Sequence, residues 1–266
     1  MKLYILLFST AVLLMSGCGE KEVIEPEVLL TEIATGTSTD NEYTIKILAD
    51  TLLFVGYNNI YAEITNASGE PVTEGAVEII PTMHMTDMTH GCPVEYPDDR
   101  TPVDGRYLFH VVFVMPGMDA NNYWDLGFKI TNTNGSVHET TIKVDVVQPE
   151  RVRLRSFVSE ADQTTRYFVT LIEPKGPTVG SNDLEVGVYK KMSMMSWPAV
   201  ESVSFDMETW MPSMDHGSPN NVAPVHTGKG HYKGKVNFTM TGDWEIRLSM
   251  KENNVVCGNP VFEFLF

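Results

Sequence analysis

Methionine and histidine gather in two short segments of this 266-residue chain. The first segment contains Met83, His84, Met85, Met88 and His90. The second contains Met211, Met214 and His216. Thioether sulfur is a soft ligand that favours Cu(I), whereas imidazole accepts Cu(I), Cu(II) and Zn(II). Both segments are therefore candidate soft-metal sites, and the ligand types favour copper over zinc.

Packing is the competing interpretation of these methionines. Methionine fills irregular gaps in protein cores, and Met83 and Met85 would share one face of a strand, as core residues do. A third cluster, Met192, Met194 and Met195, has no histidine near it in the sequence. We therefore place the predicted metal ligands in the first two segments only.

Cysteine offers two further roles. His84, Asp87, His90 and Cys92 include the ligand types of a tetrahedral zinc site, although their spacing matches no zinc-finger pattern. Apart from Cys18, only Cys92 and Cys257 are present. An oxidising compartment would permit a disulfide between these two residues, which would join the two halves of the chain. Cys92 and Cys257 thus remain candidates for a disulfide or for metal ligation.

Catalytic signatures are missing from the sequence. It contains no Gly-x-Ser-x-Gly elbow, no glycine-rich phosphate loop and no His-Glu-x-x-His motif. The formal net charge of −16 also argues against a nucleic-acid partner, because phosphate binding requires a basic surface. We expect a non-catalytic protein that does not bind nucleic acid.

The amino-terminal residues predict the protein's address. Residues 1–17 combine a basic start with a short apolar run, as in a bacterial secretion signal. Small residues precede Cys18, as in the lipoprotein cleavage box, so Cys18 is the predicted lipidation site. Residues 18–40 are expected to hold this cysteine and a flexible tether. The membrane is then a partner through the lipid anchor, at the outer membrane or the cell surface.

Short strands follow the tether. Runs such as 43–47, 107–111 and 141–146 alternate between apolar and polar residues, and clusters of Gly, Asn, Asp and Pro separate them. About seven such strands in roughly a hundred residues is typical of an immunoglobulin-like sandwich. The predicted fold is all-β, with two tandem immunoglobulin-like sandwiches at 41–148 and 149–266. Trp124 and Trp244 are the expected core anchors, because aromatic residues supply much of a sandwich core.

An internal repeat supports the division into two domains. Several short motifs recur in the same order, which indicates a tandem duplication. The paired motifs are Val55-Gly56-Tyr57-Asn58 with Val179-Gly180-Ser181-Asn182, Pro81-Thr82-Met83 with Pro212-Ser213-Met214, Gly105-Arg106-Tyr107 with Gly230-His231-Tyr232, Met115-Pro116-Gly117 with Met240-Thr241-Gly242, and Trp124-Asp125 with Trp244-Glu245.

These motifs resemble the YtkA-like family, which is similar to the FixH-type and CopC-like copper-handling modules. The second copy is the closer match, through its run from Met211 to Gly217, and the first carries Met83-His84-Met85 in the equivalent place. The resemblance covers nearly all of residues 41–266. It implies a small envelope β-sandwich more firmly than it implies an activity.

Two functions remain open at this point. The first is a lipid-anchored envelope protein that binds copper for buffering or for transfer to an envelope metal-handling partner. The alternative is an immunoglobulin-like interaction module that binds a protein or glycan partner and no metal. The position of the methionines separates them, because a copper site requires sulfur and imidazole to converge.

Overall fold

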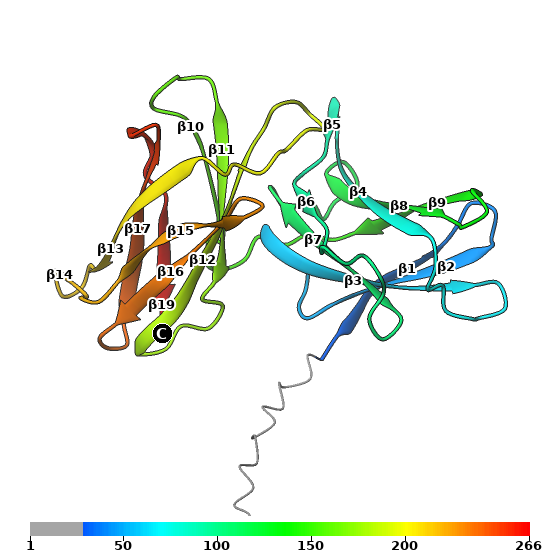
Figure 1. Cartoon of the computed structure of the whole chain (residues 1–266), viewed down its shortest axis with the longest axis horizontal. Helices are drawn as coiled ribbons and strands as arrows, with labels where there is room; N and C mark the ends of the chain where they lie inside the picture. Colours follow the sequence, from blue (N-terminus) through cyan, green and yellow to red (C-terminus); the bar gives the residue numbers. More distant parts are fainter. Residues whose placement is uncertain (1–28) are drawn as a thin grey trace, which may run out of the picture.

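The computed structural model describes residues 29–266, so the predicted leader and Cys18 lie outside the described residues. Within 29–266 the regular structure consists of β-strands, which form two sandwiches (Figure 1). No helix in this part of the chain is long and apolar enough to cross a membrane. The fold is all-β, as the alternating sequence pattern predicts.

The first sandwich consists of two antiparallel sheets. One sheet has the strand order β1-β2-β3-β7-β6, and the other has the order β5-β4-β8-β9. The strands are β1 (Thr31–Thr37), β2 (Tyr43–Ala49), β3 (Gly56–Asn66), β4 (Ala76–Met85), β5 (Met88–His90), β6 (Val94–Glu95), β7 (Arg106–Phe113), β8 (Tyr123–Thr131) and β9 (Val137–Val144). Strand β1 lies inside the predicted tether; the sequence conceals it because none of its residues is fully buried.

The second sandwich repeats this arrangement. Its sheets have the orders β10-β11-β12-β16-β15 and β14-β13-β17-β18, and β19 also pairs with β17. The strands are β10 (Leu154–Val158), β11 (Arg166–Glu173), β12 (Gly180–Lys190), β13 (Val203–Met211), β14 (His216–Gly217), β15 (Val222–Gly228), β16 (His231–Phe238), β17 (Asp243–Glu252), β18 (Val255–Gly258) and β19 (Val261–Leu265). The two halves thus share one strand order, except that β18 and β19 of the second sandwich together occupy the place of β9 in the first.

The repeated asparagine has the same structural role in both copies. The side chain of Asn58 accepts a hydrogen bond from the Phe54 amide and donates to the carbonyls of Phe54 and Gly56. Asn182 makes the same three bonds with Thr178 and Gly180. Each asparagine therefore holds the turn that leads into its long central strand. This equivalence supports the duplication that the sequence predicts.

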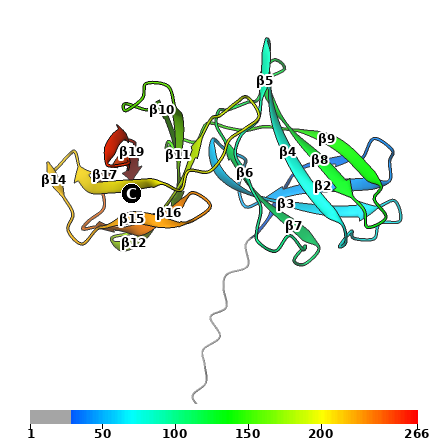
Figure 2. The same cartoon turned by 45° about the horizontal axis from the view of Figure 1, so that its top comes forward.

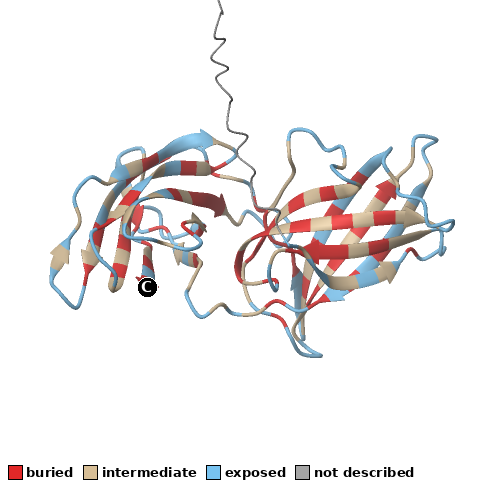
Figure 3. Ribbon diagram, turned by 90° about the horizontal axis from the view of Figure 1, so that it is seen from below, coloured by how far each residue is buried: buried red, intermediate tan, exposed pale blue. Residues whose placement is uncertain are grey.

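Each sandwich has its own core. Buried and less buried residues alternate along the strands, as Figure 3 shows. Trp124 and Trp244 are almost completely buried, as expected, and each indole nitrogen donates to a methionine carbonyl, Met115 or Met240. Such aromatic burial contributes strongly to the stability of a sandwich. The strand β5 projects from the end of the first sandwich (Figure 2), and the segment after it is hydrogen-bonded to the second sandwich through Gly91 and Met194.

Candidate metal centre

The first methionine-histidine segment forms the hairpin of β4 and β5. Met83 lies directly opposite His90 in this pairing, and both side chains are buried. Met85 is half-buried, and Met88 at the tip is exposed. The predicted residues therefore do not gather at one point, because the alternating strand directs them to different faces.

His90 is the predicted ligand whose ring faces a thioether sulfur. Its Nδ1 lies 2.7 Å from the carbonyl oxygen of Gly91, and its Nε2 lies 3.4 Å from the sulfur of Met115. A carbonyl oxygen only accepts, so Nδ1 carries the proton and the neutral ring has its lone pair on Nε2. Burial lowers the pKa of His90, which keeps the ring neutral. Two electron-pair donors therefore face each other, the nitrogen of the buried His90 and the thioether sulfur of the half-buried Met115.

A core tryptophan completes the surroundings of His90. The ring of Trp124 meets the imidazole edge-on at a centroid separation of 5.5 Å. Strand pairing places Met83 beside the same tryptophan. Methionine, histidine and tryptophan therefore share the end of the first sandwich at β5.

The second sandwich repeats the constellation. The Nδ1 atom of His216 lies 2.8 Å from the Gly217 carbonyl, and the imidazole meets Trp244 edge-on at 5.5 Å. Met211 lies opposite His216 in the strand pairing, as Met83 lies opposite His90. The structure thus aligns Met83 with Met211, which corrects the repeat alignment of Met83 with Met214.

The second copy is more open than the first. Met211 is buried in the core, whereas Met214 is 58% exposed at the turn before β14. His216 is only half-buried. The two sites therefore share their backbone geometry and differ in access to solvent.

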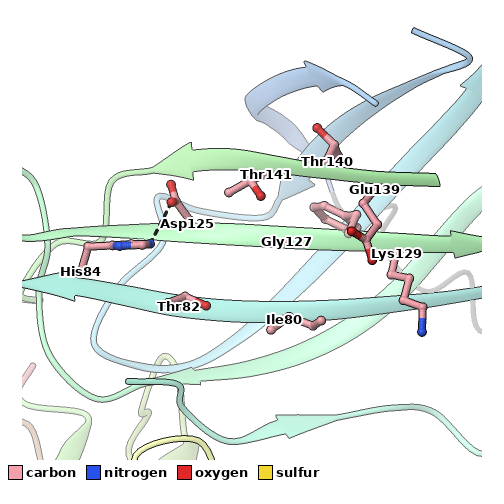
Figure 4. A pocket seen from close by; sticks show the side chains of 10 residues that line it. Ile80, Thr82, His84, Asp125, Gly127, Lys129, Glu139, Thr140 and Thr141 are labelled. Carbon is pink, nitrogen blue, oxygen red and sulfur yellow. Dashed lines mark ion pairs between the residues drawn. The ribbon is translucent and has the colours of Figure 1, made fainter. Parts of the chain in front are cut away.

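His84 does not join the candidate centre. It lies on the outer face of the β4-β8-β9 sheet, where its Nε2 is 2.9 Å from an Asp125 oxygen (Figure 4). Its ring also stacks on Tyr123 at 4.7 Å. These contacts occupy the imidazole on the face opposite to Met83, because successive residues of a strand alternate.

The two cysteines within residues 29–266 form no bridge. Cys92 and Cys257 are both free, and each is buried in the core of a different sandwich. The disulfide that the sequence left open is not formed, because the two thiols lie in different cores. Burial raises the pKa of the Cys92 thiol well above its usual range, which suppresses the thiolate that would ligate a metal.

The zinc alternative also lacks its geometry. Among residues 29–266, no group of three His, Cys, Asp or Glu side chains is arranged to hold a metal ion. His84 and His90 lie on different faces of the hairpin, and Cys92 is in the core. Zinc usually requires four such ligands, so the described donors fit a thioether-accepting ion better.

A second cluster of titratable groups lies between the two sandwiches. Glu95 of β6 accepts hydrogen bonds from Tyr57, from Tyr189 (2.5 Å) and from His231 (2.8 Å), and the other nitrogen of His231 lies 2.7 Å from Glu185. Burial alone would lower the pKa of His231, but the bonds to Glu185 and Glu95 outweigh it and raise the pKa to about 9. We refer to these five residues as the seam cluster; its charged histidine joins carboxylates of both sandwiches.

Sequence reasoning missed two parts of this arrangement. Met115 is not among the predicted ligands, although its recurrence as Met240, near each tryptophan in the sequence, is a usable signal. Glu95 is not among the predicted site residues either, and no local pattern in the sequence indicates its buried contacts. Both depend on contacts between residues far apart in the chain.

Comparison with known proteins agrees with the fold. Residues 161–249 match the model of the YtkA-like family. Solved structures with similarity include the Escherichia coli adhesin FdeC, at 15% identity over 87% of this chain and 65% of that chain with a TM-score of 0.28. The Yersinia pseudotuberculosis adhesin InvE is similar at 14% identity over 86% of this chain and 60% of that chain, with a TM-score of 0.26.

The chain spans less than two thirds of the length of either adhesin structure. Because the TM-scores are low, we base no conclusion about this chain on these two similarities. No curated protein sequence matches the chain. The matched residues 161–249 run from the turn before β11 into β17. The second sandwich is therefore a YtkA-like domain, as its sequence motifs predict.

Proposed function

We propose that the chain is a non-catalytic, lipid-anchored protein of a bacterial envelope that binds copper as Cu(I) and buffers it or hands it to a partner. The YtkA-like match of the second sandwich supports the envelope address. The predicted Cys18 lipidation supports the anchor. The observation that carries the metal assignment is the 3.4 Å approach of His90 Nε2 to Met115 Sδ.

This pair fits a soft ion for three reasons. Both atoms carry lone pairs and neither carries a proton, so they cannot form a hydrogen bond with each other. A cation bound between them would replace the repulsion of the two lone pairs with two attractive contacts. An ion bonded at about 2.0 Å to nitrogen and at about 2.3 Å to sulfur can join two ligand atoms that are at most about 4.3 Å apart. The 3.4 Å between His90 Nε2 and Met115 Sδ lies within this limit. A thioether with an imidazole selects Cu(I) over harder ions.

Buffering or transfer requires no catalytic group. Ligand exchange between thioether and imidazole sites moves the ion without acid–base chemistry. Two sites of unequal exposure, at His90 and at His216, suit storage and delivery respectively. Met211, Met214 and His216 would supply the open site, and Met83, His90 and Met115 the closed one.

A metal titration tests the proposal. Residues 19–266 are titrated with Cu(I) under reducing conditions against a coloured chelator, and the expected result is competition with two ions bound per chain. Met115→Leu should weaken the closed site by about tenfold, because leucine keeps the volume and removes the sulfur. Met207→Leu in β13 is the matched control and should leave binding unchanged.

Absence of competition with the chelator would overturn the copper proposal. The tandem sandwiches would then be assigned to protein or glycan binding, and the methionines to packing. Equal effects of Met115→Leu and Met207→Leu would show that Met115 is not a ligand.

A further inference from the structure

A loop of the second sandwich lies against the closed site of the first. Residues 191–199 form most of the connection between β12 and β13 and extend toward β5 (Figures 1 and 2). The Gly91 amide donates to the Met194 carbonyl at 2.8 Å, and the Trp197 indole nitrogen donates to the same carbonyl at 3.1 Å. One carbonyl of the loop thus ties it to the residue that follows His90.

Trp197 is a second tryptophan that lies beside the ring of His90. Its ring centroid lies 5.9 Å from the imidazole, and it is only 9% exposed. The indole also packs against Phe168 of β11 at 4.9 Å. Although Trp197 belongs to the second sandwich by sequence, it forms part of the first sandwich's core. The His90 site is therefore closed by a side chain of the other domain.

The same loop presents thioethers to solvent. Met192, Met194 and Met195 are 64%, 44% and 55% exposed. Methionine is usually among the buried residues, so three exposed copies in one turn are unusual. A Cβ atom built on Gly91 would lie 3.8 Å from the sulfur of Met195. At least one exposed sulfur therefore lies beside the backbone that carries His90.

We propose that Met192, Met194 and Met195 form the loading position through which Cu(I) reaches His90 and Met115. This inference rests on the proposed function, because it adds a route to the same closed site. A set of thioethers without imidazole or carboxylate favours Cu(I) over Cu(II) and zinc. The ion passes from sulfur to sulfur and nitrogen by ligand exchange and remains Cu(I), so no electron or proton is transferred.

The division of labour follows from burial. The exposed sulfurs hold the ion weakly, because solvent competes for it and no imidazole contributes. His90 and Met115 hold it under Trp197, away from water. The loop therefore governs how quickly the site fills, and the buried pair governs how tightly the ion is held.

Rate and affinity measurements separate these roles. Ag(I), a redox-stable substitute for Cu(I), is mixed with residues 19–266 in a stopped-flow instrument, and tryptophan quenching reports its arrival. The triple variant Met192→Leu, Met194→Leu, Met195→Leu should bind Ag(I) about tenfold more slowly, with equilibrium affinity within about threefold of the parent. Met118→Leu, an exposed methionine of another loop, is the matched control and should change neither quantity.

Each other outcome is decisive. An unchanged rate in the triple variant would overturn the loading position and leave the metal site intact. A loss of affinity as large as that of Met115→Leu would place these sulfurs in the resting site, which also contradicts a loading role. If the parent chain binds no Ag(I), the proposed function fails and this inference fails with it. Leucine preserves the side-chain volume, and circular dichroism verifies that the variant folds.

Discussion

His231→Gln is expected to destabilise the protein in a strongly pH-dependent manner. The imidazolium of His231 lies between Glu95 of the first sandwich and Glu185 of the second, at 2.8 and 2.7 Å. The three side chains are only 15%, 10% and 17% exposed, so solvent screens their interactions little. Glutamine keeps a hydrogen-bonding group but removes the positive charge that both carboxylates require.

The pKa of His231 sets the size of the effect. Its ordinary value of 6.5 rises to about 9 in the folded protein. At about 1.4 kcal/mol for each pKa unit, the charge contributes on the order of 3 kcal/mol to the free energy of unfolding. The lowered pKa values of Glu95 and Glu185 arise in large part from the same contacts with His231. They are therefore not added to this free energy, because that would count the same interaction twice.

The sign follows from the direction of the shift. Because the folded pKa is raised, the stabilisation is fully present below pH 6.5 and is lost as the pH rises through about 9. The carboxylates have lowered pKa values, so their contribution persists above pH 4.5 and is lost in more acidic solution. The parent and the variant should therefore differ most near pH 6 and converge above pH 9.

Urea unfolding followed by tryptophan fluorescence measures the difference. At about pH 6 the variant should lose about 3 kcal/mol, and above about pH 9.5 most of this loss should vanish. His226→Gln is the matched control, because His226 is exposed on β15 and has no carboxylate partner among its described contacts. A penalty of constant size from pH 6 to 10 would refute the reasoning, because it would assign the role of His231 to packing.

Three further predictions concern other parts of the chain. Asn58→Ala should cost about 2 kcal/mol in urea unfolding, because it leaves buried backbone groups unpaired; Asn182→Ala, at a more exposed position, should cost less, and equal costs would contradict this ranking. Cys92 and Cys257 should react with a thiol reagent only after denaturation, and rapid reaction of the native chain would contradict their burial. The affinity of the closed site for Ag(I), measured by competition with a chelator, should remain constant from about pH 7.5 to about pH 6.5. Burial lowers the pKa of His90, so protons compete with the ion only in more acidic solution. A steady decline of the affinity over this range would contradict the prediction.

The strand framework was predictable because its information is local. Alternation at a period of two marks the strands around Tyr43 and Tyr107, and the glycines at 105 and 230 occupy turns with φ of 75° and 76°. Left-handed backbone favours glycine, so the repeated Gly-x-Tyr motif has a direct conformational cause. Strand β1 was missed because its residues are at most half-buried.

The candidate site was predictable only in part, because its ligands meet across the sandwich. His90 and Met83 come from one segment, but the sulfur that faces His90 belongs to Met115, after β7. His84 has the same side chain as His90, yet its position on the outer face of β4 directs it to Asp125. Residue type therefore suggested the proposed chemistry, and only the pairing of strands determined which of the candidate residues face one another.

The contact between the sandwiches could not be read from the sequence, although it connects the candidate metal centre with the seam cluster. A short segment from His90 to Glu95 is held by the second sandwich at two points, through the Gly91 amide at Met194 and through Glu95 at His231. Any shift between the sandwiches must move this segment, and with it the ring that faces Met115. Suppose that an ion binds His90 and Met115 more tightly when the two sandwiches are in contact. By linkage, the ion then stabilises the contact between the sandwiches by the same free energy that this contact adds to ion binding. The tandem duplication thus provides two sandwiches of which one completes, through its loop and its histidine, the site carried by the other.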